Sequence, residues 1–144
     1  MVVKFKLIDK RTRVSKDIEK LQKKVADIQP EFMKRLVSEI VLQSPVDTGT
    51  YMDAHNVGIV GSSTSSAGKP QNQPWQVHAD KAIERLYAQI DSLPVGVVSF
   101  IANNSLHAPK VEYEYPYAPY TIARGKAESI LKDVIMKVMR GQDV

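Results

Sequence analysis

The sequence predicts an α+β domain in which a small, mainly antiparallel sheet is covered by a long N-terminal helix and a C-terminal helix. Apolar residues recur at helical spacing over residues 14–40 and again before the end of the chain, and short apolar runs between them have the composition of strands. At 144 residues the chain has the usual length of one domain, so we expect a single domain over residues 1–144. The expected order of elements is β-α-β-α-β-β-α.

The N-terminal part predicts a short strand followed by a long helix. Residues 2–8 alternate apolar and basic side chains, which is typical of a strand with one buried face, and residues 9–13 predict a polar turn. Pro30 lies inside the helical pattern and predicts a kink or break near residues 28–29. We expect this helix to lie on the sheet, with a coiled coil as the alternative. Its apolar stripe consists of Val14, Ile18, Leu21, Val25, Ile28, Phe32, Leu36 and Ile40.

The remaining elements follow from shorter patterns. Proline and glycine in Ser44-Pro45-Val46-Asp47-Thr48-Gly49-Thr50 predict the end of the first helix and a tight turn. Residues 61–76 contain one large apolar side chain, Trp75, and predict a long flexible loop. We expect strands at 55–60, 95–102 and 111–113, with the second in the centre of the sheet. Further helices are expected at 78–91 and 123–139, and the proline-rich residues 116–120 are expected to lack regular structure.

The composition excludes several kinds of site. The chain has no cysteine, so it holds no disulfide, thiol nucleophile or cysteine-based metal site. The three histidines lie more than twenty residues apart without metal-ligand spacing, and no phosphate-binding glycine loop is present. We therefore expect neither a metal nor another cofactor.

Asp47-Thr48-Gly49 has the letters of an aspartic-protease motif, in which two carboxylates share a proton and activate water. That motif usually ends an apolar strand, whereas here it follows a helix and a proline. A turn in which the aspartate bonds its own backbone fits the sequence better. A catalytic Asp47 remains a weaker alternative.

Charge and aromatic residues are unevenly distributed. Residues 1–24 hold nine Lys or Arg against three acidic residues, a balance of +6, although the whole chain carries only +4. A basic end can face nucleic acid or an acidic protein, and it can also be an ordinary solvated surface. Four tyrosines between residues 113 and 120 are good interface material, because tyrosine buries area at low entropic cost.

Several short motifs occur in an order that resembles the tail-completion or neck (head–tail joining) proteins of long-tailed bacteriophages, also described as minor-tail-protein-Z-like tail components. These motifs are Pro45-Val46-Asp47-Thr48-Gly49 after the first helix, Asn103-Asn104 after a strand, Glu112-Tyr113, and Ala118-Pro119 before the closing helix. The sequence departs from the pattern at His107-Ala108, where the family has Tyr-Ala, and at Glu114, where it has glycine.

The resemblance implies a structural, non-enzymatic protein of the virion, assembled in the host cytoplasm. It implies a homo-oligomeric ring of six copies between the head connector and the tail, with DNA passing through the channel without sequence specificity. The implied partners are other copies of the chain, the head-completion or connector protein, and the tail-terminator or tail-tube protein, with no membrane. A small basic nucleic-acid-binding or regulatory module is the alternative.

Candidate contact residues follow from the same motifs. On the resemblance, residues 2–8 are expected to pair as an edge strand with the next subunit. The basic residues Lys10, Arg11 and Arg13 are expected to face an acidic partner or DNA. The assembly interface is expected to include Asp47, Thr48, Gly49, Trp75, Glu112, Tyr113, Tyr117 and Pro119.

Overall fold

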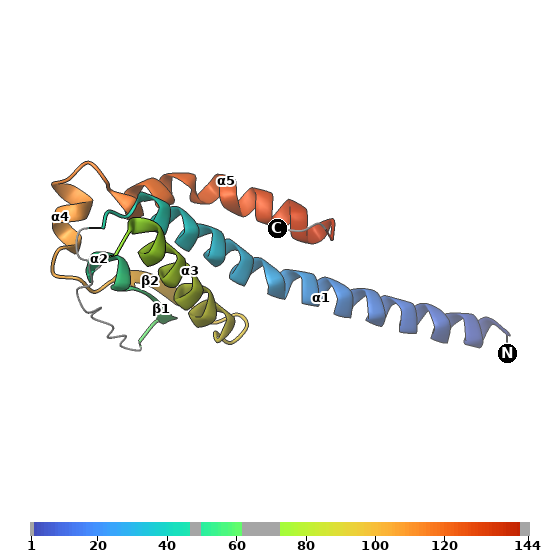
Figure 1. Cartoon of the computed structure of the whole chain (residues 1–144). Helices are drawn as coiled ribbons and strands as arrows, with labels where there is room; N and C mark the ends of the chain where they lie inside the picture. Colours follow the sequence, from blue (N-terminus) through green and yellow to red (C-terminus); the bar gives the residue numbers. More distant parts are fainter. Residues whose placement is uncertain (1, 47–49, 62–72, 142–144) are drawn as a thin grey trace.

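Helices dominate the computed structural model of the chain, which describes residues 2–46, 50–61 and 73–141, with side chains of the first helix described from Arg13 onward (Figure 1). Within these residues, five helices and a two-stranded antiparallel sheet form the small single-domain α+β arrangement that the sequence predicts. In chain order the elements are α1 (Val2–Gln43), α2 (Thr50–Asp53), β1 (His55–Ile59), α3 (Trp75–Asp91), β2 (Ser99–Asn103), α4 (Ala108–Tyr113) and α5 (Pro119–Met139).

The first 43 residues differ from the prediction. α1 runs without interruption from Val2, so the strand expected at 2–8, the turn at 9–13 and the strand pairing proposed for them are wrong. No glycine or proline occurs before Pro30, and each residue added to a helix gains a hydrogen bond within its own segment. A strand needs a neighbour for its hydrogen bonds, and alternation over seven residues supplies none.

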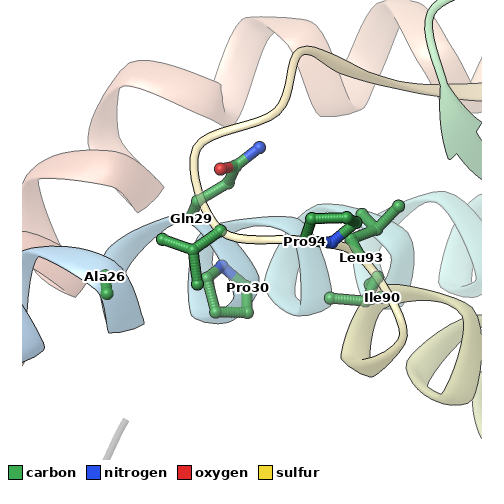
Figure 2. A pocket seen from close by; sticks show the side chains of 7 residues that line it. Ala26, Gln29, Pro30, Ile90, Leu93 and Pro94 are labelled. Carbon is green, nitrogen blue, oxygen red and sulfur yellow. The ribbon is translucent and has the colours of Figure 1, made fainter.

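α1 also continues through Pro30, so the expected break is absent. Figure 2 shows Pro30 next to Leu93 and Pro94 of the segment after α3, which line the same hollow. The neighbouring Gln29 side-chain amide donates to the Val97 carbonyl (2.9 Å) and to Ser99 Oγ (3.2 Å). The segment that leads into β2 therefore holds α1 at the position of its proline.

The core is built on the second half of α1. One face of this half packs against α3, and Met52 of α2 and Val57 of β1 complete the cluster. Its members are Met33, Val37, Val41, Met52, Val57, Ala79, Ala82, Leu86 and Ile90. The other face packs against α5, with Ile28, Phe32 and Leu36 contacting Ile130, Val134 and Val138. Ion pairs join the same two helices, Arg35 to Asp133 and Glu39 to Lys126 (2.9 Å). α1 therefore lies between two helices rather than simply on a sheet (Figure 1).

The sheet is smaller than predicted. β1 pairs only with β2, in a register that places His55 opposite Asn103 and Ile59 opposite Ser99. β2 has one neighbour in the described chain and all five of its residues are half-buried, so the central position expected for it is wrong.

Two prolines explain the remaining corrections. Residues 111–113, expected as a strand, belong to α4, which has Pro109 in its first turn. α5 begins at Pro119, inside the segment expected to be irregular and four residues before the expected start. The fixed backbone angle of proline suits the first turn of a helix, where its missing N–H is not needed. α3 likewise begins at Trp75, within the expected loop, whose residues 62–72 lie outside the described residues.

Candidate functional site

The start of β1 holds a buried polar cluster that joins four segments of the chain. His55 is fully buried at 0% exposure. Its Nε2 lies 2.8 Å from Ser44 Oγ, just after α1. Its Nδ1 lies 2.8 Å from the Tyr120 hydroxyl of α5 and 3.1 Å from Asn103 Nδ2 at the end of β2. We call Ser44, His55, Asn103 and Tyr120 the His55 cluster.

The hydrogen bonds define the protonation of the imidazole. Asn103 Oδ1 accepts from the Ser105 N–H (2.8 Å), which leaves Nδ2 to donate to His55 Nδ1. The proton of the neutral ring therefore lies on Nε2 and is donated to Ser44 Oγ, which itself donates to the Ile40 carbonyl (2.6 Å). Burial, and secondarily the charge of Arg85, lowers the pKa of His55 to about 3, so the ring is uncharged at neutral pH.

This arrangement has the residue types of a nucleophile and base but not their geometry. A base must accept the proton of the nucleophile, and here the imidazole donates to the serine. Ser44 is 2% exposed and His55 is closed off beneath it, so no substrate reaches either side chain. The cluster instead ties together the ends of α1, β1, β2 and α5.

Two tyrosines surround the imidazole. The Tyr51 ring meets His55 edge-on, with centroids 5.0 Å apart, and the Tyr120 ring lies at 5.6 Å. Burial raises the pKa of both phenols above its usual value, so both stay protonated. The Tyr120 hydroxyl donates to His55, whereas the Tyr51 hydroxyl has no hydrogen-bond partner among the described residues.

Glu112 caps α5. No side chain of the segment just before α5 caps it, and the helix follows Ala118, whose φ of 38° is in the left-handed region. The Glu112 carboxylate of α4 accepts from the backbone N–H of Tyr120 (3.1 Å) and of Thr121 (2.6 Å), and from the Thr121 hydroxyl (2.6 Å). A carboxylate at a helix N-terminus satisfies its free donors and interacts well with its dipole.

The residues predicted as an interface divide into inward and outward groups. Trp75 packs on the core and its indole N–H donates to the Ser44 carbonyl (2.8 Å), and Pro119 is buried. Tyr113 is 83% exposed and Tyr117 43% exposed, and with the half-exposed Tyr115 they form an aromatic patch over α4 and the α4–α5 link. Glu112 is partly exposed, and its carboxylate caps α5.

A recess adjoins this patch. Its lining includes Tyr51, Asn103, Glu112, Tyr113, Tyr120 and Arg124, so it opens beside the His55 cluster and the cap of α5. Glu112 and Tyr113 thus belong to one surface, while Trp75 is not part of its lining and instead bonds the backbone just after α1.

Other predicted residues lie elsewhere. Asp47, Thr48 and Gly49 fall outside the described residues, so the structure does not test the interface or the protease hypothesis there. Lys10 and Arg11 belong to the N-terminal part of α1, and Arg13 is exposed on the same helix. This end of α1 lies far from β1 and from the start of α5 (Figure 1).

The histidines do not gather. His78 is buried on α3, with Nδ1 3.9 Å from Asp53 Oδ1, while His107 is exposed before α4. In the described part of the chain no three His, Asp or Glu side chains lie close enough to hold a metal ion.

Sequence reasoning missed the role of His55, because its partners are 11, 48 and 65 residues away. The only available signal was that Ser44, Asn103 and Tyr120 each belong to or border a motif of the phage-like pattern.

Comparison of the chain with protein-family models, curated protein sequences and solved structures finds no match. Across the described ranges, none of the helices combines the length and apolar character that a bilayer-spanning helix requires.

Proposed function

We propose that this chain is a structural protein of the neck of long-tailed bacteriophages, which completes the tail and joins it to the head. In this role, copies of the chain form a ring of six between the head connector and the tail, and DNA passes through the channel. The other partners are a head-completion or connector protein and a tail-terminator or tail-tube protein. The role involves no catalysis.

The observation that carries the proposal is the convergence of separate motifs on one buried residue. Ser44 begins the segment that contains Pro45-Val46-Asp47-Thr48-Gly49, Asn103 begins Asn103-Asn104, and Tyr120 follows Ala118-Pro119. Their side chains all contact His55, at 2.8, 3.1 and 2.8 Å respectively. Motifs that build one end of the molecule together are expected to be retained together.

The exposed tyrosine patch supports an assembly role for that end. Large aromatic side chains left in solvent beside a well-ordered core are typical of interface anchors. Tyr113 and Tyr117 project from α4 and its link to α5, which the Glu112 cap holds in place. A ring of many copies converts such individually weak contacts into a stable joint.

The decisive experiment is electron microscopy of lysates from a phage that carries a stop codon in this gene. We expect filled heads and separate, unjoined tails. Complementation with the wild-type gene should restore joining, and complementation with Tyr113→Ala/Tyr117→Ala should restore it poorly. Normal infectious particles from the stop-codon phage would reject the proposal.

The basic residues in the first 24 positions favour a second candidate, a nucleic-acid-binding module. Arg13, Lys16, Lys20 and Lys23 are all exposed on α1. A DNA-binding module should bind duplex DNA with a steep dependence on salt, because each neutralised phosphate releases counterions. A neck subunit should bind duplex DNA only weakly as a free chain.

The basic residues also allow a test of the neck proposal itself. Charge reversal at Lys10, Arg11 and Arg13 should reduce head–tail joining if these residues face an acidic connector or the channel DNA.

A further inference from the structure

Residues 13–27 of α1 leave their apolar stripe uncovered. From Ile28 onward the stripe packs against α5, but α5 ends at Met139, whose carbonyl accepts from the Lys24 amine (3.1 Å). Beyond that point α1 projects alone, as Figure 1 shows. We call residues 13–27 the arm. Its four stripe residues are about half exposed: Val14 (55%), Ile18 (49%), Leu21 (48%) and Val25 (54%).

An arm of this kind needs a covering partner. A single helix in water is only marginally stable, and helices in proteins are held mainly by burial of an apolar face. The spacing of Val14, Ile18, Leu21 and Val25 is four, three and four residues, which is the seam of a two-helix coiled coil. The apolar pattern that α5 covers from Ile28 onward therefore also occurs in the arm, where no described residue covers it.

The arm is complementary to itself when two copies run antiparallel. A seam that pairs Ile18 with Leu21 of a second copy also pairs Val14 with Val25, so every layer is apolar. In this register Asp17 flanks the seam opposite Lys24 of the second copy, and the two-fold symmetry repeats the pair. Lys24 has three donors, so its bond to Met139 leaves it able to meet that carboxylate.

Other arrangements fit less well. A shift of one heptad brings Arg11 into the seam opposite Leu21 and places Asp17 opposite Asp17 of the second copy. A parallel pair keeps apolar layers but places Asp17 beside Gln22, so no opposite charges meet. Charge complementarity therefore favours one antiparallel register.

The body offers room for the second arm at its edge. A groove lies beside the stripe, lined by Leu21, Gln22, Val25, Ala26 and Gln29 of α1 and by Val95 and Gly96. Val95 is 78% exposed and the nearby Val98 is 74% exposed, so the groove borders further uncovered apolar surface. In this register the helix residues that precede the arm of the second copy would run past Val25 toward this groove.

We propose that the free protein forms a two-fold dimer in which the arms pair antiparallel over residues 14–25. Such an interface uses the same surface on both copies and closes at two, whereas a ring of six requires two different surfaces. The dimer therefore uses a different interface from those of the proposed ring. This inference does not depend on the proposed function.

Sedimentation velocity of the full chain over a range of concentrations tests the pairing. We expect a monomer–dimer equilibrium in the micromolar range, since two heptads bury a small interface. Leu21→Glu should weaken the dimer at least about tenfold, because it places two charges in the seam. Lys23→Gln, which changes the net charge equally on the opposite side of the helix, should leave the dimer unchanged.

Cross-linking determines the orientation, because the chain has no cysteine of its own. A mixture of Val14→Cys and Val25→Cys proteins should form the mixed disulfide in preference to either homodimer. A chain that stays monomeric at all concentrations, or a dimer that Leu21→Glu does not weaken, would overturn the proposal. Preferential Val14→Cys homodimers would overturn the antiparallel arrangement. Circular dichroism of each variant confirms that the helices are retained.

Discussion

The two ends of α1 differ in whether nearby side chains find partners within the chain. At the C-terminal end, Ser44 follows the helix and bonds His55, both ring nitrogens of which have partners within a closed cluster. In the arm, Leu21 and Val25 remain about half exposed because α5 does not extend far enough to cover them. The difference teaches that the part of the protein around the C-terminal end of α1 is stabilised by contacts within the chain, whereas none of the described residues covers the apolar stripe of the arm.

The largest contrast should come from truncating one leucine in the core, on α3, and one leucine in the arm of α1. Leu86 is buried in the core at 0% exposure. Leu86→Ala should therefore lower the free energy of unfolding by about 2–5 kcal/mol. Leu21→Ala in the arm should cost less than about 1 kcal/mol in dilute solution, because the side chain is already half exposed. Urea denaturation at low protein concentration measures both. Equal losses would mean that the arm is as well covered as the core.

The sequence predicted the stripe on α1 but not which element covers each part of it. Phe32 and Val25 are equivalent in the pattern, yet α5 covers Phe32 and leaves Val25 exposed. Periodicity records that a face is apolar, whereas the length and direction of α5 decide where covering stops. The strand expected at residues 2–8 failed for a related reason, because alternation does not show whether a second strand is available.

The candidate site was predictable only in part. The aromatic side chains of Tyr113 and Tyr117 predict contact residues, and both are exposed. The sequence does not predict the role of His55, because its hydrogen-bond partners come from distant segments. Pro119 belongs to the same motif as Tyr120 but is buried, since a motif does not state which of its side chains points outward.

The second prediction concerns pH and the His55 cluster. Burial lowers the pKa of His55 from 6.5 to about 3, so the unfolded chain binds a proton below pH 6.5 that the folded chain rejects. Stability is therefore lost as pH falls, by about 2 kcal/mol between pH 7 and pH 5. Urea denaturation across this range measures the loss. The dimer proposed for the arms should not share it, because no histidine lies in the arm.

The matched control replaces a different histidine. His107→Gln should leave the pH dependence unchanged, because His107 is exposed. His55→Gln should flatten the dependence even if it lowers stability at every pH. A slope that survives His55→Gln would assign the effect to another group.

The third prediction concerns the cap of α5. Glu112→Ala removes the acceptor for the Tyr120 and Thr121 N–H groups and should cost about 1–2 kcal/mol. Glu114→Ala, two residues away and exposed, should cost less than about 0.5 kcal/mol. Thermal denaturation of both variants provides the comparison. A loss of unfolding free energy above about 0.5 kcal/mol for Glu114→Ala would show that the exposed end of α4 makes stabilising contacts of its own.

The last prediction concerns two hydroxyl deletions next to His55, one of which should have almost no effect. Tyr120→Phe removes a donor to the imidazole and should cost about 1–2 kcal/mol, because the ring then loses part of its buried hydrogen bonding. Tyr51→Phe removes a buried hydroxyl that has no partner in the described chain, so unfolding free energy should change by less than about 0.5 kcal/mol or rise. Denaturation midpoints of the two variants separate these cases. A loss above about 1 kcal/mol for Tyr51→Phe would indicate that the hydroxyl has a hydrogen-bond partner outside the described residues.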